Sequence, residues 1–283
     1  MKEEIKKAND FFANSQFFDN KVRQKIEKKS EVSFDKLMVW CCKKCYEKPN
    51  DSIILGNKEY VRFILFSVYR HKEILEELWK HTSYTMDKSY RIRMLDNPIQ
   101  FKQYLWEMYL KYYFILKGKI LKKNSNNVGP DIGFENNSKN IYIECVVPDV
   151  GENDFKVPEM EMNGCSQVPI EELKQRLKYA LNTKIVKYKE YIDEGLVLEK
   201  DKLLIAINTS CLSYYGNLMD CIEPLILYAC KEISIFEKNP FIDGVMYNHK
   251  SIFEYNSKFK IIFINKDYSL ITDEENICKL EVI

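Results

Sequence analysis

The chain has 283 residues, a formal net charge of +1 and 46% hydrophobic residues. This length accommodates one large domain or a core with an added helical part, and the hydrophobic content is sufficient for a sizeable core. A net charge so close to zero is not that of a protein that coats nucleic acid.

No apolar run reaches membrane-spanning length, and the start MKEEIKKAND lacks the apolar stretch of a signal peptide. The nine cysteines are scattered, and their odd number argues against a disulfide scaffold and for a reducing compartment. We therefore expect a cytoplasmic protein that does not contact membranes.

Helical patterns dominate residues 1–97. They cover residues 3–29, 33–47 and 58–82, and turn residues follow at 49–51 and 96–98. This predicts a helical N-terminal region, residues 1–97, which could form a substrate-binding arm, a dimer surface or a lid. The cluster Cys41, Cys42 and Cys45 has no second ligand pair nearby, and Cys41 and Cys45 lie on an apolar helical stripe, which favours small core residues over a zinc site.

The next predicted helix, residues 99–117, is apolar nearly all round, which is typical of a buried helix. Glu107 is its only acidic residue, and Leu110 and Phe114 lie on the same side at i+3 and i+7. Two interpretations of Glu107 remain open at this point. It either contributes to a buried polar site or points to solvent from the helix surface.

Two carboxylates follow. Asp131 comes directly after the turn Gly129-Pro130, and Glu144 lies inside the β-branched run 141–147, which predicts a buried strand. A carboxylate in an apolar strand is unfavourable unless it is paired or binds a cation. Two such carboxylates joined by a hairpin-length connection suit a hard divalent ion such as Mg²⁺.

The loop 148–169 is acidic, with five acids and one lysine between positions 149 and 161. Loops of this length are uncommon inside a compact domain and are usually functional or mobile. This one could gate a site or provide Glu159 to a second metal, although an acidic, solvated loop is the plainer account.

Residues 170–192 have helical periodicity. Lys184 lies near the centre of the apolar stripe, four residues after Ala180, while Arg176 and Lys187 lie at its edge. A lysine at such a position either extends outward to solvent or reaches a buried carboxylate. We predict that Lys184 reaches Glu144, because an ion pair offsets the desolvation of both groups.

Three more strands are predicted at 203–208, 244–247 and 260–265, with a helix at 217–235. The order of helices and strands after residue 98 suits a mixed sheet flanked by helices. We therefore predict an α/β core over residues 98–283, with a C-terminal strand extension.

The order Pro130-Asp131, twelve further residues, then Glu144 resembles the core of the PD-(D/E)XK nuclease superfamily. The resemblance covers roughly residues 100–210 and implies a restriction-endonuclease-like αβββαβ core. It also implies that Asp131 and Glu144 hold Mg²⁺ or Mn²⁺ together with the backbone carbonyl of Cys145. Glu107 matches a helix glutamate that joins the metal site in this superfamily, and the resemblance implies that it does so here through water.

The superfamily has a lysine two residues after the glutamate, where this chain has Val146. Some members move this lysine to the helix after the glutamate strand, and Lys184 matches that place. The resemblance then implies metal-dependent hydrolysis of phosphodiesters, with DNA expected before RNA by analogy. A homodimer is compatible with it.

Basic residues flank this predicted site. Residues 108–128 carry five lysines and no acid, and positions 171–189 have six basic residues against two acidic ones. We expect these to bind substrate phosphates, unless they only keep exposed turns soluble. The candidates for substrate binding are Arg176, Lys187, Lys122 and Lys123.

The absence of a lysine at position 146 and the near-neutral charge leave an alternative. The chain could be a catalytically inactive nuclease fold that binds nucleic acid or protein. In that case Asp131 and Glu144 are held by local donors and bind no ion. The nuclease interpretation instead requires the carboxylates of Asp131 and Glu144 to lie within about 4 Å of each other. It also requires the Lys184 amine to point into the same cleft.

Overall fold

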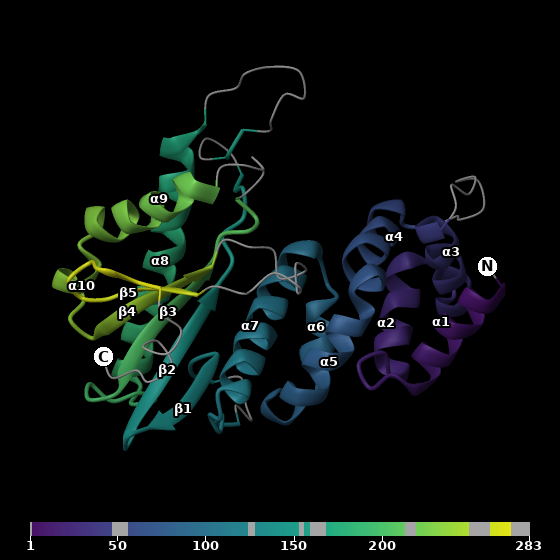
Figure 1. Cartoon of the computed structure of the whole chain (residues 1–283), viewed down its shortest axis with the longest axis horizontal. Coiled ribbons are helices and arrows are strands. Elements are labelled where there is room, and N and C mark those ends of the chain that lie inside the picture. The colour runs from purple at the N-terminus through teal and green to yellow at the C-terminus, as the bar shows by residue number, and fades with distance from the viewer. Residues whose placement is uncertain are drawn as a thin grey trace. The chain divides into compact units, whose positions relative to one another are not determined.

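The computed structural model of the chain describes residues 2–46, 56–123, 128–152, 156–158, 168–212, 219–248 and 261–272. The chain forms two compact units, Met1–Met108 and Tyr109–Ile283 (Figure 1). The division falls inside helix α7 (Pro98–Leu116), whereas the sequence places it before this helix, at residue 97.

The first unit is helical in its described part, as the sequence predicts. The pattern over residues 58–82 is interrupted in the structure by a π-helical turn and a short 3-10 turn. Cys41 and Cys42 are buried and Cys45 is exposed. The elements before α7 are α1 (Lys2–Asn14), α2 (Asn20–Ser30), α3 (Phe34–Tyr46), α4 (Lys58–Phe63), η2 (Ile64–Val68), η3 (Tyr69–His71), α5 (Lys72–Thr82), η4 (Ser83–Thr85) and α6 (Tyr90–Met94).

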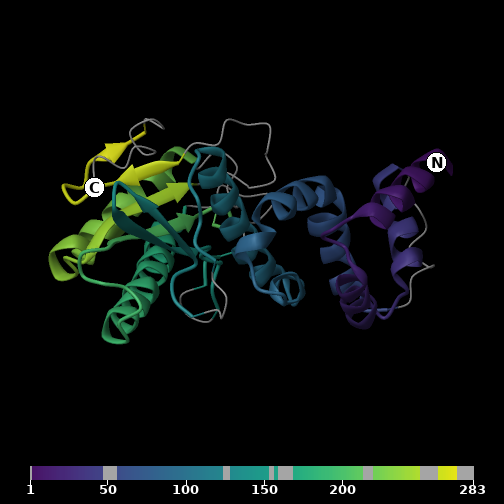
Figure 2. The same cartoon turned by 90° about the horizontal axis from the view of Figure 1, so that it is seen from below.

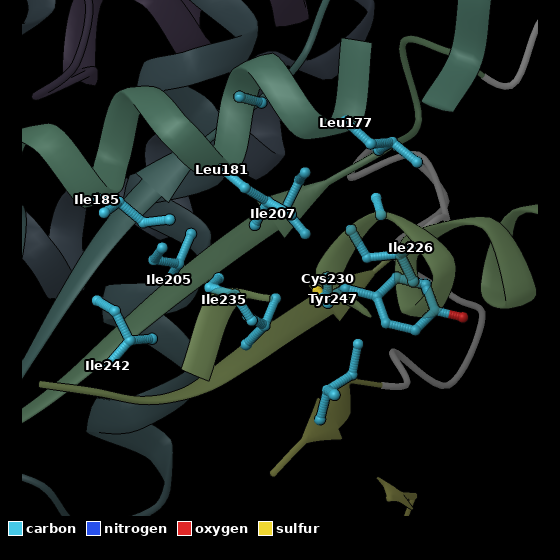
Figure 3. Packing of buried hydrophobic residues seen from close by; sticks show 14 of the residues in the cluster. Leu177, Leu181, Ile185, Ile205, Ile207, Ile226, Cys230, Ile235, Ile242 and Tyr247 are labelled. Atoms are coloured by element: carbon cyan, nitrogen blue, oxygen red, sulfur yellow. The ribbon is translucent and has the colours of Figure 1, made fainter. Parts of the chain in front are cut away.

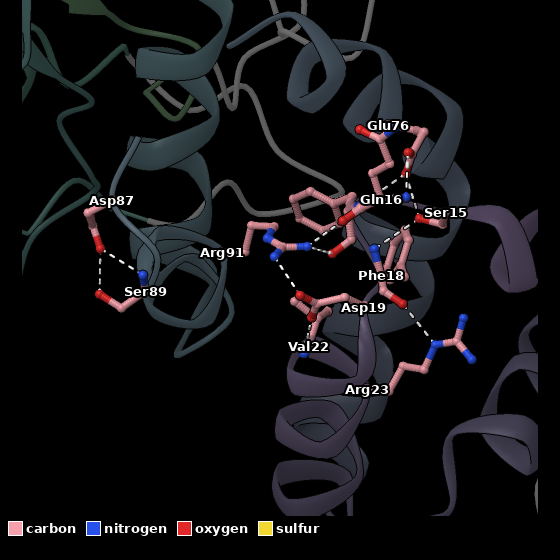
Figure 4. A network of polar contacts seen from close by, with 11 residues as sticks. Ser15, Gln16, Phe18, Asp19, Val22, Arg23, Glu76, Asp87, Ser89 and Arg91 are labelled. Atoms are coloured by element: carbon pink, nitrogen blue, oxygen red, sulfur yellow. Dashed lines mark hydrogen bonds and ion pairs between the residues drawn. The ribbon is translucent and has the colours of Figure 1, made fainter. Parts of the chain in front are cut away.

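The turn between α1 and α2 replaces the middle of the single helix predicted over residues 3–29. Glu76 of α5 accepts hydrogen bonds there from the backbone N–H groups of Gln16, at 2.7 Å, and Phe17, at 3.0 Å (Figure 4). Asp19 then caps α2 by accepting from the Val22 N–H at 3.0 Å. A carboxylate from a distant helix and a local N-cap therefore stabilise this break together.

The second unit contains a six-stranded sheet in the order β1-β2-β3-β4-β5-β6. Strands β2, β3 and β4 are parallel to one another, and the remaining pairs are antiparallel. The chain is thus mixed α/β, as the sequence predicts. The strands are β1 (Ile132–Asn136), β2 (Lys139–Val146), β3 (Lys202–Asn208), β4 (Ile242–Asn248), β5 (Ile262–Ile264) and β6 (Leu270–Ile271).

One predicted strand is reduced to a single bridge. The αβββαβ order needs a strand between α7 and the strand that follows Asp131. In the described residues of that segment, Leu121 forms one antiparallel bridge with Phe134, and the Lys122 N–H donates to the Gly133 carbonyl at 2.7 Å. Residues 124–127 lie outside the described part.

Helices α8 (Ile170–Asp193), α9 (Met219–Glu232) and α10 (Ile235–Lys238) provide apolar residues to one continuous core with the sheet. Figure 3 shows how the side chains from α8 and α9 meet those of β3 and β4, and α8 lies beside the strands in Figure 2 as well. Tyr142 and Val146 of β2 pack against this core, so Glu144, two residues from each, lies on the same sheet face. The residues of this core that Figure 3 labels are Leu177, Leu181, Ile185, Ile205, Ile207, Ile226, Cys230, Ile235, Ile242 and Tyr247.

The opposite face of the sheet is also apolar. Ile143 and Cys145 of β2 are fully buried there, beside Phe134 of β1, whose ring centroid is 4.8 Å from that of Phe114. Strand β2 is therefore covered on both faces around Glu144, whose side chain is fully buried. None of the helices in the described part is long and apolar enough to cross a lipid bilayer.

Substituting Gly244 with alanine is expected to destabilise the protein by about 1–3 kcal/mol, the usual range for an overpacked core. A Cβ at this position would lie 2.2 Å from the buried Phe263 ring and 3.1 Å from the Ile264 carbonyl oxygen. Gly133→Ala is the control, because its Cβ would lie 3.0 Å from the half-buried Tyr142 ring, which can move. Urea unfolding measures the free energy of unfolding of both variants. Equal losses of stability in Gly244→Ala and Gly133→Ala would contradict this account.

Candidate metal centre

The hairpin of β1 and β2 brings the two predicted carboxylates together. Ile132 pairs with Ile143 in the antiparallel register, so the preceding residue, Asp131, lies across from Glu144 on the same face. The Asp131 Oδ2 accepts a hydrogen bond from the backbone N–H of Cys145 at 2.8 Å. This bond fixes Asp131 beside the strand that carries Glu144.

Glu144 is fully buried and has three donors, all from α8. The amines of Lys184 and Lys187 lie 2.8 Å and 3.0 Å from Oε2, and the Tyr191 hydroxyl lies 3.2 Å from Oε1. These donors are spaced three and four residues apart, so they share one face of the helix. Both oxygens of Glu144 are therefore satisfied by local side chains.

Lys184 links the two carboxylates. Its amine lies 3.8 Å from the Asp131 Oδ2 as well as 2.8 Å from Glu144, and only 12% of its side chain is exposed. Lys187 is more open to solvent, with 38% of its side chain exposed. The lysine that the sequence predicts in the apolar stripe thus lies beside both carboxylates.

The charges in this cluster shift one another's pKa values. Burial raises the pKa of Glu144 above 4.5, and the Asp131 carboxylate adds to the effect, while Lys184 and Lys187 oppose it. Burial alone would lower the pKa of Lys184, but the attraction of Glu144 and Asp131 outweighs it, so that this pKa is raised above 10.5. The same balance raises the pKa of Lys187. Both amines therefore stay charged at neutral pH.

We expect the free energy of unfolding to fall as the pH rises above 10.5. The lysine pKa values are higher in the folded chain than the ordinary 10.5, so the folded state holds protons that the unfolded state releases. This contribution is complete below 10.5 and is lost as the pH rises through the folded values. Because Glu144→Gln removes the main attraction, this variant should lose less than the wild type in urea unfolding. An equal loss in both proteins would contradict the assignment.

The residues present fit a magnesium ion. Mg²⁺ is usually held by one or two carboxylates and keeps several waters, and Asp131 and Glu144 provide that number. Within the described ranges, no hydrogen bond reaches Oδ1 of Asp131, so this atom can accept a ligand. A bound ion would compete with Lys184 and Lys187 for Oε2 of Glu144. No group of three or more His, Cys, Asp or Glu side chains that could hold a metal occurs in the part of the chain that the structure describes.

The other predicted site residues fall in several places. Glu107 is buried in α7 and lies within the first unit, so the solvent-facing interpretation does not hold. Its role as a metal ligand stays a prediction, as does that of the Cys145 carbonyl. Lys122 donates to Asn140 at 2.7 Å and lies over the Tyr142 ring, and Lys123 is exposed. Glu159 lies outside the described residues.

Arg176 and Lys187 have different ion-pair partners in the structure. Lys187 forms an ion pair with Glu144, whereas Arg176 forms an ion pair with Asp149, just beyond β2. Sequence reasoning did not single out Tyr191 as a donor or Asp149 as a partner. The spacing of Tyr191, four residues after Lys187 on the same stripe, is the signal that could have indicated its role.

Comparisons with models of protein families, with curated proteins and with solved structures found no match. The site therefore has to be interpreted from its own chemistry.

Proposed function

We propose that this protein is a metal-dependent nuclease that hydrolyses phosphodiester bonds, with DNA expected before RNA. The observation that carries the proposal is the position of Lys184. A buried lysine contacts both carboxylates of a hairpin that follows a Pro-Asp turn. The order α7, β1, β2, α8 and β3 supports a restriction-endonuclease-like core, in which the bridge at Leu121 takes the place of the first strand.

Asp131 and Glu144 would hold the ion, with the Cys145 carbonyl as a further ligand. A bound Mg²⁺ supplies an acidic water and stabilises negative charge on a phosphate. Lys184 keeps its positive charge, so it can orient a nucleophilic water or neutralise charge that develops on the phosphate. Lys187 is the more exposed amine and is placed to contact the substrate. Lys122 and Lys123 extend the basic surface in the segment before β1.

Metal binding changes the charge balance of the cluster. Asp131 and Glu144 carry two negative charges, and Lys184 and Lys187 carry two positive ones, so the cluster is neutral by itself. A divalent ion would leave two uncompensated positive charges. Because these charges lie in a largely desolvated site, they attract an anionic substrate strongly. This supports a phosphodiester over a neutral substrate.

One observation favours a second candidate, the catalytically inactive binding module. Both oxygens of Glu144 already have donors within the protein. A fully satisfied buried carboxylate needs no ion, so the cluster could serve only to hold α8 against β2. The two candidates differ in whether a divalent ion displaces an amine from Glu144.

Cleavage of plasmid and single-stranded DNA with Mg²⁺ or Mn²⁺ tests the proposal in the wild type, Glu144→Ala and Lys184→Ala. Metal-dependent cutting that is lost in both variants is the expected result. Cutting that is lost only in Glu144→Ala would keep the metal site and reject the role of Lys184. A wild type that cuts neither substrate would contradict the proposal and favour the binding module.

A further inference from the structure

Arg176 is held by two oxygens of a single residue. Its guanidinium forms an ion pair with the Asp149 carboxylate, and its Nε donates to the Asp149 backbone carbonyl at 2.9 Å. The guanidinium also lies over the exposed Tyr179 ring, at 5.5 Å from its centroid. A planar guanidinium with two adjacent donors fits the oxygens of a phosphate in the same way.

The backbone after β2 is shaped for this contact. The Gly151 N–H donates to the Asp149 Oδ1 at 3.0 Å, and Gly151 has a φ of +77°. A Cβ at this position would lie 3.0 Å from Cζ, Nε and Nη1 of Arg176, so a glycine permits the close approach. Val157, which is buried in the α8 and α9 core, donates its N–H to the Val150 carbonyl at 2.7 Å. The segment that carries Asp149 is thus anchored at Val157, beyond the contact.

Arg176 also lies on the same side of α8 as the lysines of the carboxylate cluster. Arg176, Ala180 and Lys184 are spaced four residues apart, which places Arg176 about 12 Å along the helix axis from Lys184. This separation is too large for both groups to contact one phosphate. It suits a second phosphate of the same strand.

We infer that Arg176 forms a subsite for a backbone phosphate of nucleic acid, and that Asp149 occupies this subsite until substrate replaces it. This deepens the proposed function, on which it rests, by naming a second contact and an internal competitor. The side chains of Arg176 and Asp149 are 17% and 34% exposed, so an anion from solvent can reach the pair. The Tyr179 ring keeps the guanidinium oriented when Asp149 leaves.

Binding of a fluorescently labelled single-stranded DNA, measured by anisotropy in EDTA, tests this inference without requiring cleavage. Asp149→Asn is expected to bind about three- to tenfold more tightly than the wild type, because the competing carboxylate is gone. Arg176→Gln should bind more weakly, with a salt dependence shallower by about 0.7, the value of one phosphate contact on a single strand. In the Asp149→Asn/Arg176→Gln double variant, the gain in affinity that Asp149→Asn causes should disappear.

Glu152→Gln is the matched control, since it removes the same charge from an exposed position in the same segment. Asp149→Ser is a second test, because serine can still accept from the Gly151 N–H and so keep the turn. Equal tightening by Glu152→Gln, or tightening that persists without Arg176, would mean a general charge effect and would overturn the inference. Absence of binding by the wild type and by Asp149→Asn would also overturn it.

The same samples separate this inference from the proposed function. If the Asp149→Asn effect is present in EDTA but no variant cuts DNA when Mg²⁺ is added, the phosphate subsite stands and the nuclease proposal fails. If the wild type cuts DNA and Asp149→Asn changes neither the affinity nor the salt dependence, the nuclease proposal stands and the subsite is rejected.

Discussion

Replacing Lys184 by methionine is expected to lower the free energy of unfolding by about 3 kcal/mol, near the lower end of the cost of breaking a buried ion pair. Glu144 is fully buried, and Lys184 lies 2.8 Å from it. Without this amine, a buried carboxylate keeps only Lys187 and Tyr191 as donors. Methionine retains most of the apolar stem, so the loss measures the charge and not the packing. Urea unfolding followed by circular dichroism gives the value.

A double-mutant cycle with Glu144→Gln isolates the pair. The Lys184→Met/Glu144→Gln variant should be less destabilised than the sum of the two single changes, by about 1–3 kcal/mol, as expected for residues in contact. Lys178→Met is the control on the same helix, since its ion pair with Glu232, at 3.2 Å, lies at the surface and should contribute within about 0.5 kcal/mol. Additive effects of Lys184 and Glu144 would mean that the pair contributes no stability.

The second large effect concerns catalysis. Lys184→Met should lower the single-turnover rate of DNA cleavage in Mg²⁺ by a factor of about 10²–10³, as the removal of one preorganised donor does in other hydrolytic sites. The reason is that the amine keeps its charge and is aimed at the site between Asp131 and Glu144. Metal affinity should not decrease in this variant, because the ion and the amine compete for Glu144. Quenched-flow cleavage assays and Mn²⁺ titrations measure the two quantities separately.

In contrast to Lys184→Met, Asp131→Asn should weaken metal binding as well as cleavage. It removes a metal ligand and keeps the shape of the side chain, so both the metal affinity and the cleavage rate should fall by at least about tenfold. The Lys178→Met control should leave both unchanged. If Lys184→Met loses metal binding together with activity, the lysine holds the fold of the site and does not act in the reaction.

The sequence predicts the parts of the site in which a charged residue lies among apolar residues that are expected to be buried. Glu144 lies in a run of apolar β-branched residues, and Lys184 lies in an apolar helical stripe, so each needs a partner of opposite charge. Strand and helix periodicity then give the faces on which the partners lie. The mixed α/β architecture follows from the same periodicities.

The remaining features depend on contacts between distant segments. The break between α1 and α2 is stabilised by Glu76, which lies some sixty residues further along the chain. The two units divide inside α7, whereas the turn at Pro98, from which the sequence placed the boundary, marks only where that helix begins. The pairing of Asp149 with Arg176 needs the path of the backbone around Gly151, which local propensities do not specify.

Binding of Mn²⁺ to the wild type and to Asp131→Asn, measured by calorimetry near neutral pH in low salt, tests the central claim most directly. The claim is that Asp131 and Glu144 exchange their lysine partner for a divalent ion. It predicts one bound ion per chain and an affinity at least about tenfold weaker in Asp131→Asn. A wild type that binds no Mn²⁺ beyond the level of Asp131→Asn would show that the buried lysine and carboxylates form only a structural ion pair.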